Sequence, residues 1–282
     1  MARRGARSSF LVTHTPRTVR ELLDRFDLHP SRALGQNFVV DPNTVRRIAR
    51  AASVGPGDVV VEIGAGLGSL TLALVETGAE IHAIEVDRYL LAPLRETVEP
   101  FGVAVHHVDA MRADYAAILE GRRAVVVANL PYNIATPLIV HLLEAEPLLE
   151  RLVVMVQREV GERLAAYAGD EAYGAASLRV QYFADAELVG RVPASVFLPR
   201  PHVESVVVAL VRRETVRVDP SWVSESELFD VVRTAFAQRR KMLRRSLADW
   251  ADPGVFARAD VEGTRRPEEL TIDEFARLAA QR

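Results

Sequence analysis

The middle of the chain alternates between two hydrophobic patterns. Short continuous apolar runs, typical of buried strands, alternate with stretches in which apolar residues recur every three or four positions, as in helices. The expected strands are 58–63, 80–86, 103–108, 124–128 and 152–157. The helices expected between them are 69–76, 88–98, 115–120 and 137–144. This alternation predicts βαβ units, and therefore an α/β fold with a mostly parallel sheet.

Both ends of the chain follow other patterns. Residues 17–27 have helical spacing, and Asp41-Pro42 reads as the N-cap and first residue of another helix. The apolar runs 187–192 and 205–211 have no long helix between them, so we expect an antiparallel pair at one end of the sheet. Beyond a polar stretch only helical patterns remain, which predicts a small all-α domain. The expected units are an N-terminal arm and helix (1–30), an α/β domain (31–214) and a helical domain (215–282).

Composition excludes several classes of protein. The 282 residues include no cysteine, which removes disulfides, cysteine zinc sites and thiol nucleophiles. The apolar runs are far shorter than the ~20 residues that span a bilayer. The apolar stretch near the N-terminus, 10–12, is shorter than the roughly seven residues that a signal peptide needs. We therefore expect a cytoplasmic protein with no membrane partner.

A glycine-rich segment joins the first buried strand to a helix. It reads Glu62-Ile63-Gly64-Ala65-Gly66-Leu67-Gly68. Glycines at such a junction allow the backbone to approach a ligand closely. The dinucleotide pattern G-x-G-x-x-G would require glycine where this chain has Ser69. The segment resembles the nucleotide loop of S-adenosylmethionine-dependent methyltransferases, and its alternative interpretation is a packing turn.

Two acidic residues follow successive strands. Glu85 ends the second strand, about 20 residues after the first glycine, where a ribose-binding acid is expected. Asp109 follows the third strand, where its carboxylate can accept from an adenine amino group. A single carboxylate in a loop is usually only solvated. Two at neighbouring strand ends favour a ligand site, because ligands of open α/β sheets bind at that edge.

The fourth strand leads into Asn129-Leu130-Pro131-Tyr132. The amino group of adenine is a poor nucleophile because its lone pair is delocalised into the ring. The Asn129 side chain and the Leu130 backbone offer carbonyl oxygens to its N–H groups, and Tyr132 can stack on a base removed from its helix. In isolation the segment would be an ordinary proline turn. Directly after this glycine loop and strand, it predicts amino methylation of a base.

Together these motifs resemble the KsgA-type ribosomal-RNA adenine dimethyltransferases, from about residue 34 to about residue 247. The resemblance rests on the glycine loop, the Asn-Leu-Pro-Tyr turn and three further segments, 34–38, 197–205 and 236–241. Members often have leucine in place of Val39 and aspartate in place of Glu204, which are conservative differences. The resemblance implies a Rossmann-like class I methyltransferase sheet, S-adenosyl-L-methionine as methyl donor, and no metal.

The resemblance also implies a reaction and residue roles. The expected product is N6,N6-dimethyladenosine at two adjacent adenosines near the 3′ end of small-subunit (16S) rRNA, with a role in small-subunit biogenesis. The implied cofactor-binding residues are Asn37, Val39, Gly64, Gly66, Glu85, Asp109 and Asn129. The implied catalytic residues, which hold the target amine or stack on its base, are Asn129, Leu130, Tyr132 and Phe197.

Local charge indicates an RNA partner although the net charge is −3. Residues 231–250 contain six cations and one acid. The proposed RNA-binding members are Arg239, Arg240, Lys241, Arg244 and Arg245. Such a cluster suggests phosphate contacts, whereas the ordinary alternative is a solvated helix face. The partners expected from the resemblance are small-subunit rRNA and the immature small subunit, bound by a monomer.

Three other functions compete with this interpretation. An Erm-type enzyme would dimethylate one large-subunit rRNA adenine and confer macrolide resistance, but such enzymes tend to carry isoleucine at the position of Leu130 and to lack the 236–241 segment. A nicotinamide-dependent reductase is disfavoured by Ser69 and by the Asn-Leu-Pro-Tyr turn. A ribosome-assembly factor whose methylation is secondary remains compatible with the first choice.

Overall fold

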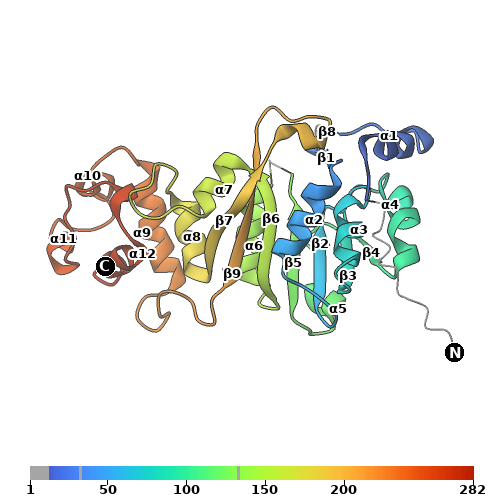
Figure 1. Cartoon of the computed structure of the whole chain (residues 1–282). Coiled ribbons are helices and arrows are strands. Elements are labelled where there is room, and N and C mark those ends of the chain that lie inside the picture. The colour runs from blue at the N-terminus through green and yellow to red at the C-terminus, as the bar shows by residue number, and fades with distance from the viewer. Residues whose placement is uncertain (1–12, 32–33, 132–133) are drawn as a thin grey trace.

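A mostly parallel sheet forms the centre of the computed structural model, which describes residues 13–31, 34–131 and 134–282 (Figure 1). Its seven strands follow the order β4-β3-β2-β5-β6-β9-β7. The strands are β2 (Val59–Ile63), β3 (Glu80–Glu85), β4 (Ala104–His107), β5 (Ala124–Asn129), β6 (Leu149–Gln157), β7 (Ala184–Val192) and β9 (Ser205–Arg212). The first five run parallel, and β9 pairs antiparallel with both β6 and β7. The predicted sheet and its antiparallel end are confirmed.

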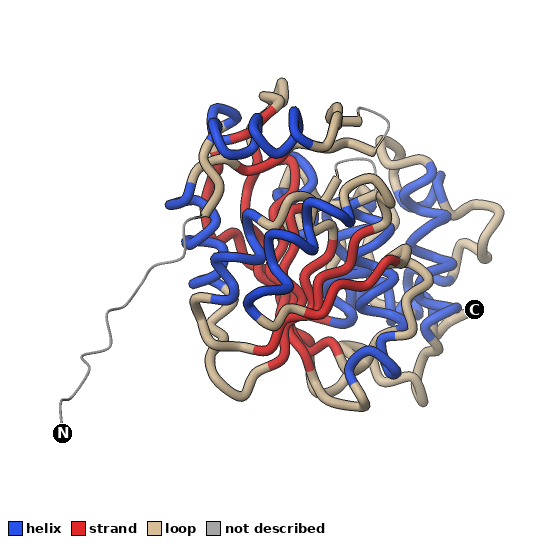
Figure 2. The backbone as a smooth tube through the Cα atoms, turned by 90° about the vertical axis from the view of Figure 1, so that its right-hand side faces the viewer, coloured by secondary structure: helices blue, strands red, loops and turns tan. Residues whose placement is uncertain are grey.

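Helices cover both faces of this sheet (Figure 2). They are α2 (Pro42–Ala51), α3 (Ser69–Val75), α4 (Leu91–Val98), α5 (Tyr115–Leu119), α6 (Ala135–Ala145), α7 (Arg158–Leu164) and α8 (Ala175–Phe183). Because side chains alternate across a strand, β2 contributes to two cores. Val61 packs with Leu138 on one face, and Val60 packs with Ile48 on the other. Helix α2 begins at Pro42 with Asp41 as its N-cap, as predicted, and α6 extends slightly beyond the expected 137–144.

The sequence pattern missed two helices between β6 and β7. One of them, α8, buries Ser177, Leu178, Val180, Tyr182 and Phe183, which point to several sides of the helix. A helix that is apolar around much of its circumference lacks the one-sided period that identifies a surface helix. The other, α7, has only seven residues. The expected sheet topology is unaffected, because both helices lie within the connection to β7.

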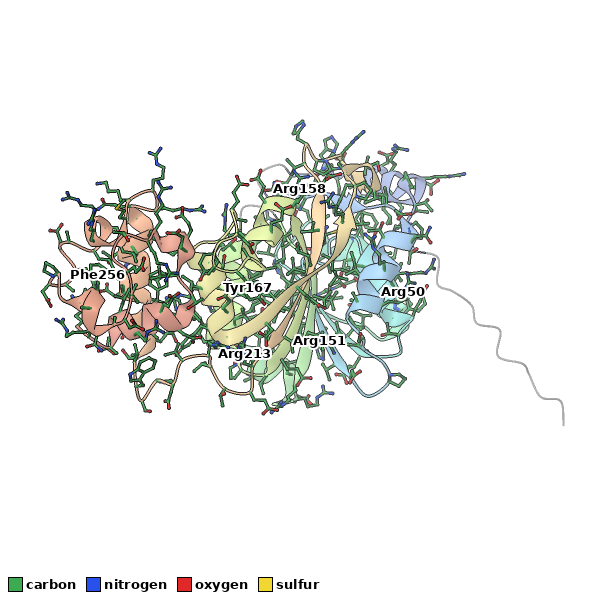
Figure 3. The ribbon with its side chains drawn as sticks, turned by 60° about the vertical axis from the view of Figure 1, so that its left-hand side comes forward. Arg50, Arg151, Arg158, Tyr167, Arg213 and Phe256 are labelled. Atoms are coloured by element: carbon green, nitrogen blue, oxygen red, sulfur yellow. The ribbon has the colours of Figure 1, made fainter. Side chains whose placement is uncertain are left out.

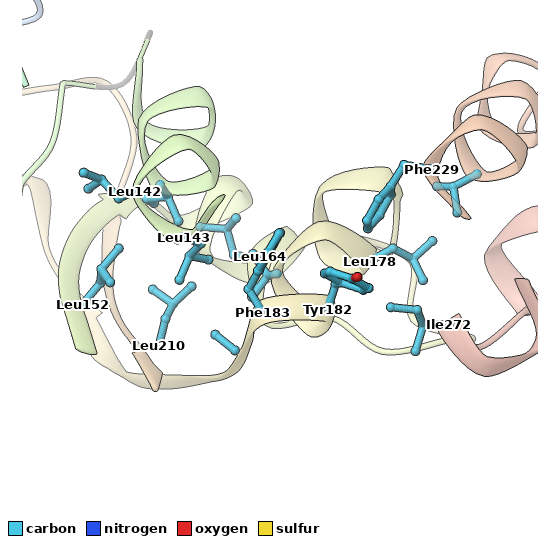
Figure 4. Close-up of a cluster of buried hydrophobic side chains, with 14 of the residues drawn as sticks. Leu142, Leu143, Leu152, Leu164, Leu178, Tyr182, Phe183, Leu210, Phe229 and Ile272 are labelled. Carbon is cyan, nitrogen blue, oxygen red and sulfur yellow. The ribbon is translucent and has the colours of Figure 1, made fainter. Parts of the chain in front are cut away.

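The C-terminal part is helical, as predicted. Its helices are α9 (Glu225–Ala237), α10 (Leu243–Ser246), α11 (Val255–Arg258) and α12 (Ile272–Ala279). Figure 4 shows that the core continues from sheet residues such as Leu210 through Tyr182 of α8 to Phe229 and Ile272. These helices therefore dock on α8 through a shared core. The expected boundary near residue 214 stays a prediction.

A small two-stranded sheet lies beside the main one. Strand β1 (Phe38–Val39) pairs antiparallel with β8 (Phe197–Leu198), with Val39 opposite Phe197. N-terminal to it, α1 (Pro16–Arg25) packs Val19 and Leu23 on a small hydrophobic cluster. This cluster also contains Phe38 and Leu67, so the N-terminal helix covers the outer side of the glycine loop.

Candidate active site

A pocket opens at the carboxyl ends of the parallel strands. Its walls come from the segment before and within β1, from the glycine loop and from the residues that follow β3, β4 and β5. The lining residues are 34–39, 62–67, 69–70, 84–86, 90, 108–110, 129–131 and 134. All seven expected cofactor-binding residues, Asn129 included, therefore line one pocket. This is the edge at which open α/β sheets bind ligands.

The glycine loop is compact because its glycines adopt left-handed backbone angles. Gly64 and Gly66 have φ values of +73° and +60°. A Cβ atom on Gly66 would lie 3.2 Å from the Phe38 ring, so a larger residue would displace the wall of the pocket. The backbone of Gly64 donates to the carbonyl of Ile84 at 2.9 Å. The loop thus lies against the end of β3, which carries the next functional residue.

Glu85 is buried at the end of β3, with 5% of its surface exposed. Its Oε2 accepts from the Gly66 backbone at 2.8 Å, and its Oε1 accepts from the Asp87 backbone at 2.9 Å. Burial raises the pKa of this carboxyl, and the backbone donors oppose the shift. Each oxygen has a second lone pair, so the carboxylate can still accept from the two hydroxyls of a ribose.

Asp109 and Asn37 lie at the rim of the pocket. Asp109 is exposed, and its Oδ1 accepts from the backbone of Met111 at 3.0 Å. Its other oxygen therefore has room for a ligand amine. The Asn37 side chain donates to the Gly35 carbonyl at 3.0 Å, which stabilises the turn that precedes β1.

The amide of Asn129 has a defined orientation. Its Nδ2 donates to the backbone carbonyl of Asn37 at 3.0 Å. A carbonyl oxygen can only accept, which assigns the NH₂ group to that side and leaves Oδ1 as the acceptor on the other. Leu130 is buried and donates from its backbone to Met155 at 3.0 Å, which fixes the start of the turn against β6. Tyr132 lies outside the described residues.

The Phe197 side chain is buried and does not line the pocket. The residue is 4% exposed and belongs to the same hydrophobic cluster as Val39, its partner in the small sheet. Stacking of a base on Phe197 stays a prediction, and it requires the ring to become accessible when substrate binds.

Comparison with known proteins agrees with this geometry. A model of the ribosomal RNA adenine dimethylase family matches residues 29–280. The ribosomal RNA small subunit methyltransferase A of Thermobifida fusca is 46% identical over 95% of this chain and 96% of its own length. The protein of the same name from Streptomyces coelicolor is 45% identical over 94% of this chain and 95% of its own.

The chain belongs to the ribosomal RNA adenine dimethylase family. Two solved structures are also similar to this chain. A dimethyladenosine transferase from Plasmodium falciparum has a TM-score of 0.71 and 26% identity, covering 84% of this chain and 94% of that one. The 23S rRNA methyltransferase ErmE has a TM-score of 0.70 and 24% identity, covering 87% and 99%, and its likeness shows the shared fold.

The dimethylase family match begins after α1, yet residues before it contact the site. His14 is buried, and its Nε2 lies 2.7 Å from the Leu67 carbonyl in the glycine loop. Burial lowers the pKa of His14, so the neutral ring donates to that carbonyl. Sequence reasoning missed this residue, and no local pattern distinguishes it.

Glu62 is a second residue whose environment only the structure reveals. It is 1% exposed beneath the glycine loop, and its Oε2 has no hydrogen-bond partner among the described residues. Burial raises the pKa of this carboxyl to about 8, against the opposing effect of Thr71, and the nearby Glu85 adds to the rise. Glu62 is therefore largely protonated at neutral pH in the cofactor-free protein.

The expected RNA-binding cations lie in the connection between α9 and α10 and within α10 itself, and all five are exposed. Arg239 is partly engaged, because its Nη2 donates to the Glu171 carbonyl at 2.6 Å and its Nε lies 3.5 Å from Glu268. Within the described chain, no ion pair involves the remaining four, Arg240, Lys241, Arg244 and Arg245. Figure 3 shows this helical end, with Phe256 labelled, projecting long side chains outward.

Two features are absent from the described residues. No helix among them is long and apolar enough to cross a membrane. No three histidine, aspartate or glutamate side chains in the same part of the chain are arranged to hold a metal ion.

Proposed function

We propose that the protein transfers methyl groups from S-adenosylmethionine to N6 of two adjacent adenosines near the 3′ end of small-subunit rRNA, giving N6,N6-dimethyladenosine. The observation that carries the proposal is the oriented amide of Asn129 at the pocket that contains Glu85. Its Oδ1, on the side away from the Asn37 carbonyl, offers an acceptor where a target amine would enter, at the end of β5.

The pocket fits the methyl donor. Glu85 offers a buried acceptor for ribose hydroxyls, and Asp109 offers an exposed one for the adenine amine. Ile84, Val86 and Val108 supply apolar walls between them. Gly64 and Gly66 keep the backbone close to the methionine part. When bound, S-adenosylmethionine supplies a methyl group already activated by its sulfonium.

The protein's own contribution is to position and polarise the target nitrogen. Asn129 Oδ1 and the Leu130 carbonyl would accept its two N–H groups, which favours the pyramidal nitrogen needed for attack. Tyr132 and Phe197 would hold the ring by stacking, which contributes about 1–3 kcal/mol per base. One N–H remains after the first transfer, so the same acceptors can bind the nitrogen for a second transfer. The proton lost from the methylated amine would pass to water.

The RNA partner is proposed to bind through the exposed cations of the helical end. The immature small subunit is the proposed substrate particle, and a monomer acting in the cytoplasm is the proposed working state. Relatives named for the small subunit, at 45–46% identity, favour this substrate over the large-subunit adenine of Erm-type enzymes. The family assignment removes the nicotinamide-dependent reductase from consideration.

The test is nucleoside mass spectrometry. Unmethylated small and large ribosomal subunits, and the naked RNA of each, are incubated with the protein and isotopically labelled S-adenosylmethionine. The proposal expects N6,N6-dimethyladenosine in small-subunit RNA only. Label confined to large-subunit RNA would support the Erm-type alternative. A product that stays at one methyl with excess cofactor would contradict dimethylation.

A further inference from the structure

Gln36 lines the pocket and connects the segment before β1 to the loop that follows β3, and both ends of its side-chain amide are used. Its Oε1 accepts from the backbone of Ser31 at 2.8 Å, and its Nε2 donates to Oδ2 of Asp87 at 2.7 Å. The residue is half-buried. With an N–H donor on one side and a carboxylate on the other, only one orientation of the amide satisfies both partners.

Asp87 belongs to the loop that follows β3. Its backbone N–H donates to Oε1 of Glu85, and its Oδ1 accepts from the backbone of Tyr89 at 3.0 Å. The two carboxylate oxygens of Asp87 therefore have separate donors, Tyr89 on one and Gln36 on the other. The carboxylate cannot rotate without losing both hydrogen bonds.

On the other side, Gln36 adjoins the residue that orients Asn129. The backbone carbonyl of Asn37 accepts from Asn129 Nδ2 at 3.0 Å. The position of residues 34–37 thus decides whether that carbonyl faces Asn129. If the segment moves, the amide of Asn129 loses the partner that distinguishes its two ends, and a flipped amide would present NH₂ to the target amine.

We propose that Gln36 is a positioning residue, which couples the loop that follows Glu85 to the orientation of the Asn129 amide by holding residues 34–37 against Asp87. The role rests on the proposed function, because Asn129 is its point of action. It predicts that loss of the Gln36–Asp87 hydrogen bond slows methyl transfer more than it weakens cofactor binding. Small displacements of a positioned group can cost up to about 100-fold in rate.

Exchanging donor and acceptor across this hydrogen bond gives the sharpest test. Gln36→Glu keeps an acceptor for Ser31 but faces the Asp87 carboxylate with another carboxylate. Asp87→Asn keeps Oδ1 for Tyr89 but turns an NH₂ group toward the NH₂ group of Gln36. In the double variant, the introduced amide can donate to the introduced carboxylate, which restores one hydrogen bond with its polarity reversed.

The rates to compare are single-turnover methyl-transfer rates on small-subunit particles, with cofactor saturating. Each single variant should be about 10- to 100-fold slower than the wild type, while its affinity for S-adenosylmethionine, measured by calorimetry without RNA, should fall less than about threefold. The double variant should return to within about threefold of the wild-type rate. Gln281→Ala is a control near the C-terminus, and it should match the wild type.

Several outcomes would overturn the proposal. The first is that both single variants transfer methyl groups as fast as the wild type. The second is that the double variant is as slow as the slower single variant. The third is that the loss of rate in every variant equals its loss of affinity for S-adenosylmethionine. Thermal melting of each variant identifies unfolding, and rescue in the double variant separates a specific hydrogen bond from general damage. If the wild type itself transfers no methyl group to adenine N6, the proposed function fails rather than the role of Gln36.

Discussion

Replacing Glu62 by glutamine should change the pH dependence of stability in a calculable way. The carboxyl has a pKa of about 8 in the folded, cofactor-free protein and an ordinary value of 4.5 when unfolded. Between these values the folded chain holds a proton that the unfolded chain releases. Stability from this group is therefore fully present below pH 4.5 and is lost as pH rises toward 8.

The magnitude follows from linkage. Each pH unit in this window is worth about 1.4 kcal/mol for a single proton. Allowing for partial protonation of the unfolded chain at pH 5, the wild type should lose about 2.5 kcal/mol relative to Glu62→Gln between pH 5 and pH 7. A pKa one unit lower would still give about 2 kcal/mol, so the prediction does not depend on the precise value.

Urea unfolding at pH 5, 6 and 7, followed by circular dichroism without cofactor, measures this difference. Glutamine is a neutral near-isostere of the protonated acid, so any constant offset in packing cancels when the two pH series are subtracted. Glu85, whose pKa is also raised by burial, is present in both proteins, and it faces a neutral group in each as long as Glu62 is protonated, so its own titration cancels over this pH range. A stability difference that stays constant within about 0.5 kcal/mol would refute a protonated Glu62.

Three further predictions concern the site and its surroundings. Asn129→Ala should slow methyl transfer by at least about 100-fold, because it removes an acceptor needed in the transition state, and calorimetry should show much smaller loss of cofactor affinity. His14→Ala should lower the free energy of urea unfolding by about 1–3 kcal/mol, since it leaves the buried Leu67 carbonyl unpaired; an unchanged value would show that water replaces the ring. Neutralising the exposed cations Arg240, Lys241 and Arg244 should reduce the slope of log affinity for RNA against log salt concentration by about 0.7–0.9 per lost phosphate contact. An unchanged slope would mean that these side chains are only solvated.

Patterns within single elements predicted most of the fold. The continuous apolar runs identified the parallel strands, because strands buried on both faces need apolar residues at every position. The pattern failed for α8, whose side chains are buried on several sides and show little helical period. It also passed over β1 and β8, which have two residues each and are strands only because they pair with one another.

The site residues likewise fall into those that a local pattern predicts and those that only contacts between distant segments place. Glu85, Asp109 and Asn129 were predictable because each lies at the carboxyl end of a parallel strand, and these ends meet at one edge of the sheet. Phe197 was expected to stack on the target base, which stays a prediction, and its buried position depends on pairing with Val39 far away in the chain. His14 depends on α1 covering Leu67, which no pattern in the glycine loop indicates.

Gln36 shows why such residues escape sequence reasoning. It lies inside the segment 34–38, whose resemblance to the family is specific, yet its chemistry indicates no role, because an amide can serve equally well in solvent, in a cap or in a ligand site. What assigns a role is that its two partners are a backbone N–H five residues earlier and a carboxylate 51 residues later. Asn129 is in turn oriented by a carbonyl 92 residues earlier in the chain. The side chains that would touch substrate can be inferred from strand ends, whereas the hydrogen bonds that orient them arise only when distant segments meet.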